Sequence, residues 1–142
     1  CLHMVRMTYW HAYHSFKVAL LWSLHLSYLV MALGLILLGL SYFSPALVFS
    51  NALHVITLGG LGLMILAMMS RVSLGHTGRA LVVSRFMVIA FSCLILAALI
   101  RFTLVLLQLH WWAWCMSAVL WIVAFLLFIK VYLPILFAPR HS

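Results

Sequence analysis

The stretch that decides the fold is residues 47–69, LVFSNALHVITLGGLGLMILAMM. A helix rises about 1.5 Å per residue and about 20 apolar residues cross the hydrocarbon core of a bilayer, so this stretch is long enough to span a membrane. One histidine, His54, interrupts its apolar character. Because hydrocarbon offers no water to solvate an imidazole, this ring needs a partner from protein or ligand.

The middle of the stretch contains the glycine-rich sequence GGLG, residues 59–62, which makes the helix narrow there. Residues without a side chain let two membrane helices approach closely, and they equally leave room for a flat cofactor. The polar sequence SRVSLGHTGR, residues 70–79, follows at once. It predicts that the helix ends at Met69 and that residues 71–79 form a polar turn carrying His76.

The composition identifies a membrane protein. Of the 142 residues 69% are hydrophobic and 6% are charged, and a soluble domain of this size cannot bury so much apolar surface. The chain has no Asp or Glu, and its formal net charge is +8. It therefore cannot supply a paired-carboxylate site or a Ser-His-Asp triad from its own residues. The basic groups bracket apolar runs, which indicates contact with lipid phosphates rather than with nucleic acid.

Four transmembrane spans are predicted, and they form one all-α membrane domain, a polytopic helix bundle over residues 1–142. The spans cover about residues 17–40, 47–69, 81–107 and 111–132. The fourth opens on His110 and a cluster of tryptophans, as is typical of the interfacial belt. The chain starts at Cys1 with no signal-peptide pattern, so it is predicted to be the C-terminal part of a longer polytopic protein.

The basic residues predict the orientation in the membrane. Seven of the eight fall on one side of the predicted spans: Arg6, Lys17, Arg71, Arg79, Arg85, Lys130 and Arg140. Only Arg101 falls toward the other side. Because cytoplasmic loops are enriched in Lys and Arg, both termini and the turn with His76 are predicted to be cytoplasmic.

Two histidines lie within spans, at different predicted depths. His25 is eight residues beyond Lys17, and His54 is seventeen residues before Arg71. At 1.5 Å per residue they lie about 12 Å and about 25 Å from the cytoplasmic face, so the two imidazoles are not expected to share one iron. Each either binds a metal at a separate site or hydrogen-bonds a neighbouring helix.

Arg101 lies near the outer end of the third span. Its guanidinium either extends to the outer headgroups or binds an anion. Since the chain has no carboxylate, that anion has to be a lipid phosphate, a residue from elsewhere or a cofactor propionate. Counting from the span ends places Arg101 and His54 at the same depth, roughly 10 Å below the outer surface.

Four segments together resemble the C-terminal part of the bacterial NnrS family: LWSLHLSYL (21–29), NALH (51–54), MMSRVSLGHTGR (68–79) and YLPILFAPR (132–140). The pattern S-R-x-S-x-G-H-T-G-R, residues 70–79, is the most specific of them. The resemblance spans nearly the whole chain, which corresponds to about the last third of a family member.

The resemblance implies a polytopic protein of the bacterial inner membrane that contains haem and copper and is linked to nitric oxide tolerance. The sequence has no C-x-x-C-H motif, so any haem is expected to be bound non-covalently. The resemblance places His25, His54 and His76 on the family's histidine-bearing segments as candidate metal ligands. It places Arg71 and Arg79 on the family's loop, and these join Arg101 as candidate cofactor-binding residues. The implied partners are the lipid bilayer, nitric oxide and the remaining helices of the full-length protein.

Two functions stay open at this point. One is a haem- or copper-binding membrane protein that acts in the nitric oxide response by binding nitric oxide or by protecting metal centres. The other is a transporter or scaffold module whose histidines and Arg101 line a path or hold helices together.

The orientation can be tested with reporter fusions. Because of the charge asymmetry, fusions after Gly78 and at Ser142 are expected to report cytoplasm, and a fusion after Ser44 periplasm. A periplasmic signal after Gly78 would invert the predicted depths of His25 and His54.

Overall fold

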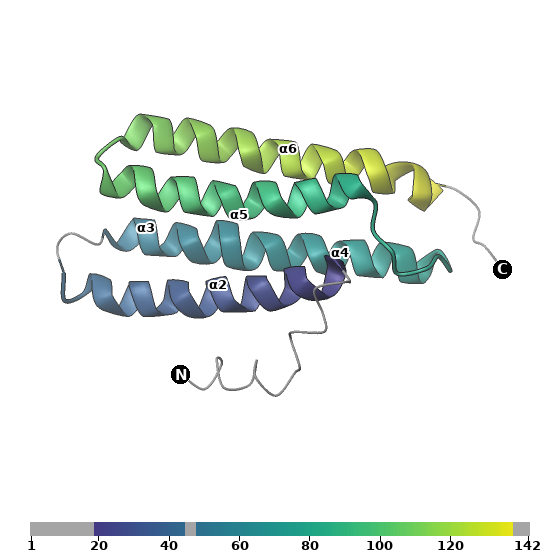
Figure 1. Cartoon of the computed structure of the whole chain (residues 1–142), viewed down its shortest axis with the longest axis horizontal. Helices are drawn as coiled ribbons and strands as arrows, with labels where there is room; N and C mark the ends of the chain where they lie inside the picture. The colour runs from purple at the N-terminus through teal and green to yellow at the C-terminus, as the bar shows by residue number, and fades with distance from the viewer. Residues whose placement is uncertain (1–18, 45–47, 138–142) are drawn as a thin grey trace.

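The computed structural model describes residues 19–44 and 48–137 of the chain, and in them it contains only helices and their connections. The helices are α2 (Ala19–Ser41), α3 (Phe49–His54), the π-helix η2 (Val55–Gly62), α4 (Leu63–His76), α5 (Arg85–Leu106) and α6 (His110–Phe137). Because α3, η2 and α4 follow one another without a break, they form one long helix, Phe49–His76. Figure 1 shows the resulting hairpins lying side by side.

Four helices in the described residues are long and apolar enough to cross a membrane: Ala19–Ser41, Phe49–His76, Arg85–Leu106 and His110–Phe137. The predicted all-α fold with four spans is thereby confirmed. Many large apolar side chains remain exposed on the outside of the bundle, as a lipid environment requires. Lys17 and Leu47, where the first two spans were predicted to begin, lie outside the described residues.

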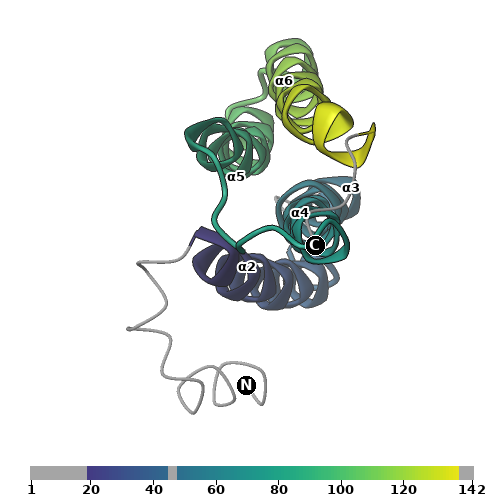
Figure 2. The ribbon, with the colours of Figure 1, turned by 90° about the vertical axis from the view of Figure 1, so that its right-hand side faces the viewer.

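The long helix Phe49–His76 is the central element of the bundle. It packs against α2, α5 and α6, and the view along the helices shows it between α2 and the pair formed by α5 and α6 (Figure 2). It is also the most buried span, with 39% of its most apolar window buried, against 17% for α6. The stretch that indicated a membrane span is therefore the one on which the others assemble.

This helix ends later than predicted. The expectation that it stops at Met69 is wrong, because α4 continues to His76 and includes Arg71. Its end is a Schellman motif: Gly78 has φ 69°, its amide donates to Gly75, and the Arg79 amide donates to the Leu74 carbonyl. The polar residues 70–76 thus extend the helix beyond its apolar part, and only residues 77–84 connect it to α5.

The other two helix ends also differ from the predicted spans. α5 begins at Arg85, after Ser84 in an extended conformation, rather than at Leu81. α6 continues through Pro134 to Phe137, beyond residue 132, where the fourth span was predicted to end. Proline is tolerated inside membrane helices because neighbouring groups satisfy the carbonyl that it leaves without a donor.

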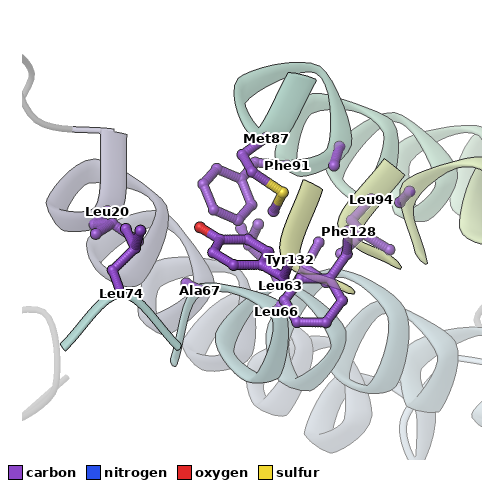
Figure 3. Packing of buried hydrophobic residues seen from close by; sticks show 12 residues of the cluster. Leu20, Leu63, Leu66, Ala67, Leu74, Met87, Phe91, Leu94, Phe128 and Tyr132 are labelled. Atoms are coloured by element: carbon purple, nitrogen blue, oxygen red, sulfur yellow. The ribbon is translucent and has the colours of Figure 1, made fainter. Parts of the chain in front are cut away.

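The buried apolar core lies at the end of the bundle where α4 ends and α5 begins. Figure 3 shows its large side chains, with Phe91 and Tyr132 projecting between the helices. Leu63 and Leu66 from the central helix and Met87 from α5 are fully buried with them. Trp22 of α2 packs its ring edge-on against Phe91, with 6.1 Å between ring centroids. This packing holds the two hairpins together.

Close helix approach occurs at the predicted glycines. A Cβ at Gly59 would lie 2.7 Å from Val30 Cγ1 and 2.9 Å from Ala98 Cβ, and one at Gly60 would lie 3.2 Å from Met31 Cα. Van der Waals packing of this kind drives helix association in membranes, where lipid removes most of the hydrophobic contribution. Gly59 therefore brings α2 and α5 against the same point of the central helix.

Gly59→Ala is expected to destabilise the bundle by about 1–3 kcal/mol, because the added methyl overlaps Ala98 Cβ, which has no rotamer to move into. Equilibrium unfolding in bicelles measures the effect. Gly39→Ala is the matched control, since nothing lies within 4 Å of that position. It should leave the bundle unchanged or stabilise it by up to about 1 kcal/mol through helix propensity. Equal effects of the two substitutions would contradict the packing role of Gly59.

Candidate functional site

His54 and Arg101 meet between the central helix and α5. Arg101 Nη2 lies 3.3 Å from His54 Nε2, a hydrogen bond between residues far apart in the sequence. The register that brings them together follows from the contact of Gly59 with Ala98, because in antiparallel helices His54 then lies within two residues, about 3 Å, of the level of Arg101. The prediction that the two residues lie at the same depth is confirmed.

The protonation of the His54 ring follows from its two hydrogen bonds. Nδ1 lies 2.6 Å from the carbonyl oxygen of Ser50, one helical turn earlier. A carbonyl oxygen only accepts, so Nδ1 carries the hydrogen. Nε2 accepts from the guanidinium of Arg101, which only donates, so Nε2 carries a lone pair. His54 is therefore a neutral imidazole with its lone pair directed at Arg101.

Asn51 reinforces this register. Its side chain is 4% exposed, and Nδ2 donates to the Phe102 carbonyl over 3.4 Å. Since Phe102 follows Arg101 directly and Asn51 precedes His54 by one helical turn, the contact ties the two site residues in place from the neighbouring turn. The Oδ1 atom of Asn51 is buried and has no hydrogen-bond partner among the described residues.

Arg101 has partners that carry no negative charge. Its guanidinium carbon lies 5.7 Å from the centroid of the Trp114 ring of α6, a cation–π contact. Its Nε is buried and finds no hydrogen-bond partner in the part of the chain that the structure describes. The side chain is half-buried and lies between His54 and Trp114. The Nε–H of Arg101 can therefore donate to a further group, and the positive charge of its guanidinium can pair with an anion.

Two cavities flank Arg101. The larger, about 460 Å³, is open to the outside of the bundle. Its lining includes His54, Arg101, Trp114, Ser117, Ala118 and Trp121. The smaller, about 210 Å³, lies toward the helix ends and includes Asn51 and His110. The larger volume lies in the range of small-molecule and cofactor sites, and two indole rings one heptad apart give it flat walls on either side of small residues.

His25 lies away from this site, as predicted. Its Nδ1 is 2.7 Å from the Leu21 carbonyl, so this ring too carries its hydrogen on Nδ1. Gly34 of α2 lies against Ile56, which places His54 level with about residue 36 of α2. The two imidazoles are therefore about 17 Å apart along the bundle. They do not belong to one iron site, and the expected separation in depth is confirmed.

The residues that the family resemblance places on the loop lie at the opposite end of the bundle. His76 is the last residue of α4, exposed, and about 33 Å along the same helix from His54. Arg71 is exposed on α4 and Arg79 follows the Schellman turn. Neither arginine can touch a group bound between His54 and Arg101. Their predicted role in cofactor binding would therefore require a second binding site.

No three His, Cys, Asp or Glu side chains cluster to hold a metal ion in residues 19–44 and 48–137. A bare metal ion at His54 would need further ligands from outside these residues. The site as described offers one imidazole donor, one guanidinium and aromatic walls.

Trp114, Trp121, Ser117 and Asn51 were not predicted as site residues. Trp114 was attributed to the interfacial belt, although its spacing from Trp121 by one heptad, with Ser117 between them, indicates one helix face. Asn51, one turn before His54 in an apolar run, carried a similar signal, since a buried amide needs partners.

The four apolar helices and the paired groups between them define the chain as a polytopic α-helical membrane protein with a polar site inside its bundle. A family model described as NnrS protein matches residues 1–140. The chain therefore belongs to the NnrS family, which confirms the predicted resemblance over nearly its whole length. No curated protein and no solved structure matches the chain significantly.

The hydrogen bonds of His54 predict a specific nuclear magnetic resonance signature. In protein labelled with ¹⁵N-histidine, His54 should show the neutral Nδ1–H tautomer, with Nε2 shifted by hydrogen bonding. Arg101→Leu should move the Nε2 resonance toward that of a free lone pair, because the donor is gone. Arg71→Leu removes the same charge at the far end of the bundle and should leave the resonance in place. A protonated Nε2 in the unsubstituted protein would contradict the assignment.

Proposed function

We propose that this chain forms part of a haem-containing membrane protein that acts in the bacterial nitric oxide response, with His54 as a haem ligand and Arg101 as the partner of an anionic group on that cofactor. The observation that carries the proposal is the pairing of a neutral, Nδ1-anchored imidazole with an arginine that has no acidic partner, beside an open cavity. Family membership supports the same class of function.

The donor chemistry of His54 suits a metal ligand. Histidines that bind metals usually donate the hydrogen of the other ring nitrogen to a carbonyl or carboxylate, which orients the ring and raises the basicity of the ligating nitrogen. The Ser50 carbonyl fulfils this role for His54, and the Leu21 carbonyl does so for His25. In both rings Nδ1 carries the hydrogen, and each histidine is proposed as the ligand of a separate centre through Nε2.

The same residues favour haem over copper at His54. Haem iron receives four nitrogens from its own macrocycle, so one histidine is a sufficient protein ligand. A copper ion needs several protein donors, and the described residues offer no such cluster. Copper, if the chain binds it, is proposed to use His25 or His76 together with ligands from outside these residues.

Arg101 would have two tasks in this function. With the Nε2 position empty of metal, it donates to His54 and holds the ring in its tautomer. With a cofactor present, its buried Nε and the rest of the fork could pair with a carboxylate, which a lysine would do less well because it lacks bidentate geometry. The indole rings of Trp114 and Trp121 would cover the flat faces of the cofactor and exclude water from them. Haem itself would supply the iron centre that binds nitric oxide.

A second candidate function is a helix-scaffold or transport module without a cofactor. The observation in its favour is that both ring nitrogens of His54 already have partners within the protein, so the ring can serve as a link between two helices.

The absorption spectrum of the purified full-length protein separates the two functions. A Soret band is expected, and His54→Ala should lower haem occupancy by about tenfold or more, as losses of metal-site residues do. Arg101→Leu should lower haem retention and shift the band, with Arg101→Lys intermediate. Wild-type occupancy and spectra in His54→Ala and in both arginine variants would overturn the proposal.

His25→Ala provides the internal comparison. Because the two rings are about 17 Å apart, their effects on metal and haem content are expected to be independent, and the double variant should show the product of the single effects. His76→Ala should change haem content least, since this exposed ring lies at the far end of the bundle.

A further inference from the structure

A cavity separate from the site of His54 lies at the opposite end of the bundle, where the connection from α4 to α5 passes the last turns of α6. Its volume is about 320 Å³. Its polar groups come from Arg79, Ser84 and Tyr132, and Leu74, Val82 and Ile135 are among its apolar walls. Figure 3 shows Tyr132 projecting into this end of the core beside Ala67.

The chain places Arg79 at this cavity by a defined backbone structure. The Schellman motif at the end of α4 reverses the chain at Gly78, and the Arg79 amide is bonded to the Leu74 carbonyl over 3.0 Å. The backbone of Arg79 is therefore held in a defined position, although the residue lies in a connection between helices. This rigidity lowers the entropy lost when its side chain holds a ligand.

Arg79 lacks a counter-group. Its Nε is buried and has no hydrogen-bond partner among the described residues, and no Asp or Glu exists anywhere in the chain to pair with it. A buried guanidinium nitrogen without a partner costs free energy unless a ligand satisfies it. Ser84, the neighbouring hydroxyl, makes no side-chain cap hydrogen bond to α5, so it is available as a second donor.

The surroundings of the cavity favour an anion further. Arg71, Arg85 and Lys130 lie at the same end of the described bundle, and Lys130 Nζ rests 4.9 Å from the centroid of Phe86. The amino end of α5 adds the positive end of its helix dipole. Because the cavity lies where membrane-spanning helices end, lipid headgroups are the anions present there at the highest concentration.

We propose that this cavity binds the phosphate of an anionic lipid headgroup, with Arg79 as the bidentate donor, Ser84 as the second donor and the apolar wall of Leu74, Val82 and Ile135 against the glycerol and first methylenes. The mixed lining suits a lipid better than free phosphate, which has no apolar part. Such a lipid would connect α4, α5 and α6 at the end of the bundle where the chain supplies only positive charge.

The test is native mass spectrometry of the full-length protein with phosphatidylglycerol, phosphatidylcholine and inorganic phosphate as separate probes. The protein is expected to retain one phosphatidylglycerol more tightly than phosphatidylcholine. Arg79→Gln should weaken this binding by about tenfold or more, since it removes a charge-assisted fork. Arg71→Gln removes the same charge from an exposed position at the same end and should weaken it by less than about twofold.

A serine pair keeps the test decisive if Arg79→Gln does not fold. Ser84→Ala should weaken phosphatidylglycerol binding severalfold, while Ser92→Ala, at an exposed serine further along α5, should not. Equal losses in Arg79→Gln and Arg71→Gln would overturn the site in favour of general surface attraction, as would loss of all binding at about 0.5 M salt. Inorganic phosphate that competes as well as the lipid would overturn the lipid assignment. Haem content should not change in either serine variant, which separates this proposal from the proposed function.

Discussion

The contact of Gly59 with Val30 and Ala98 is the constraint on which the arrangement of the bundle depends. Two helices can reach the central helix at one level only because that residue has no side chain. The contact with Ala98 also sets the antiparallel register of the central helix and α5. His54 lies five residues before Gly59 and Arg101 lies three residues after Ala98, so that register places the two residues within about 3 Å of the same level, where their side chains meet. The close contact of α5 with the central helix at Gly59 therefore determines both the packing of the bundle and the position of the site residues.

Much of this arrangement follows from the sequence. Apolar runs of sufficient length predict the four spans, and counting residues from their ends predicts that His54 and Arg101 lie level and that His25 does not. The end of the central helix was mispredicted because polarity at Ser70 was taken for a break in the helix. Polarity marks where the apolar environment ends, whereas a helix ends where its carbonyls are capped, and here Gly78 provides that cap.

Other features could not be predicted from one sequence. The π-helix at Val55–Gly62 lies directly after His54, and its sequence contains no residue type that predicts it. The contact of Arg101 with Trp114 depends on which helix lies beside α5 and on how that helix is rotated. Hydropathy determines depth in the membrane, but it carries no information on lateral neighbours. Sequence reasoning therefore placed site residues by depth and missed those that reach the site from α6.

The absence of acidic residues connects the two ends of the bundle. At one end Arg101 contacts the lone pair of His54 and the aromatic face of Trp114. At the other end the backbone amide of Arg79 is hydrogen-bonded to Leu74, and its Nε has no partner among the described residues. In both side chains Nε is buried without a partner in the described residues. A guanidinium in low dielectric attracts an anion strongly, and this chain contains none of its own. We therefore propose that each arginine pairs with an anionic group from outside the chain. The aromatic walls at Arg101 favour a flat cofactor, whereas the aliphatic wall at Arg79 favours a lipid.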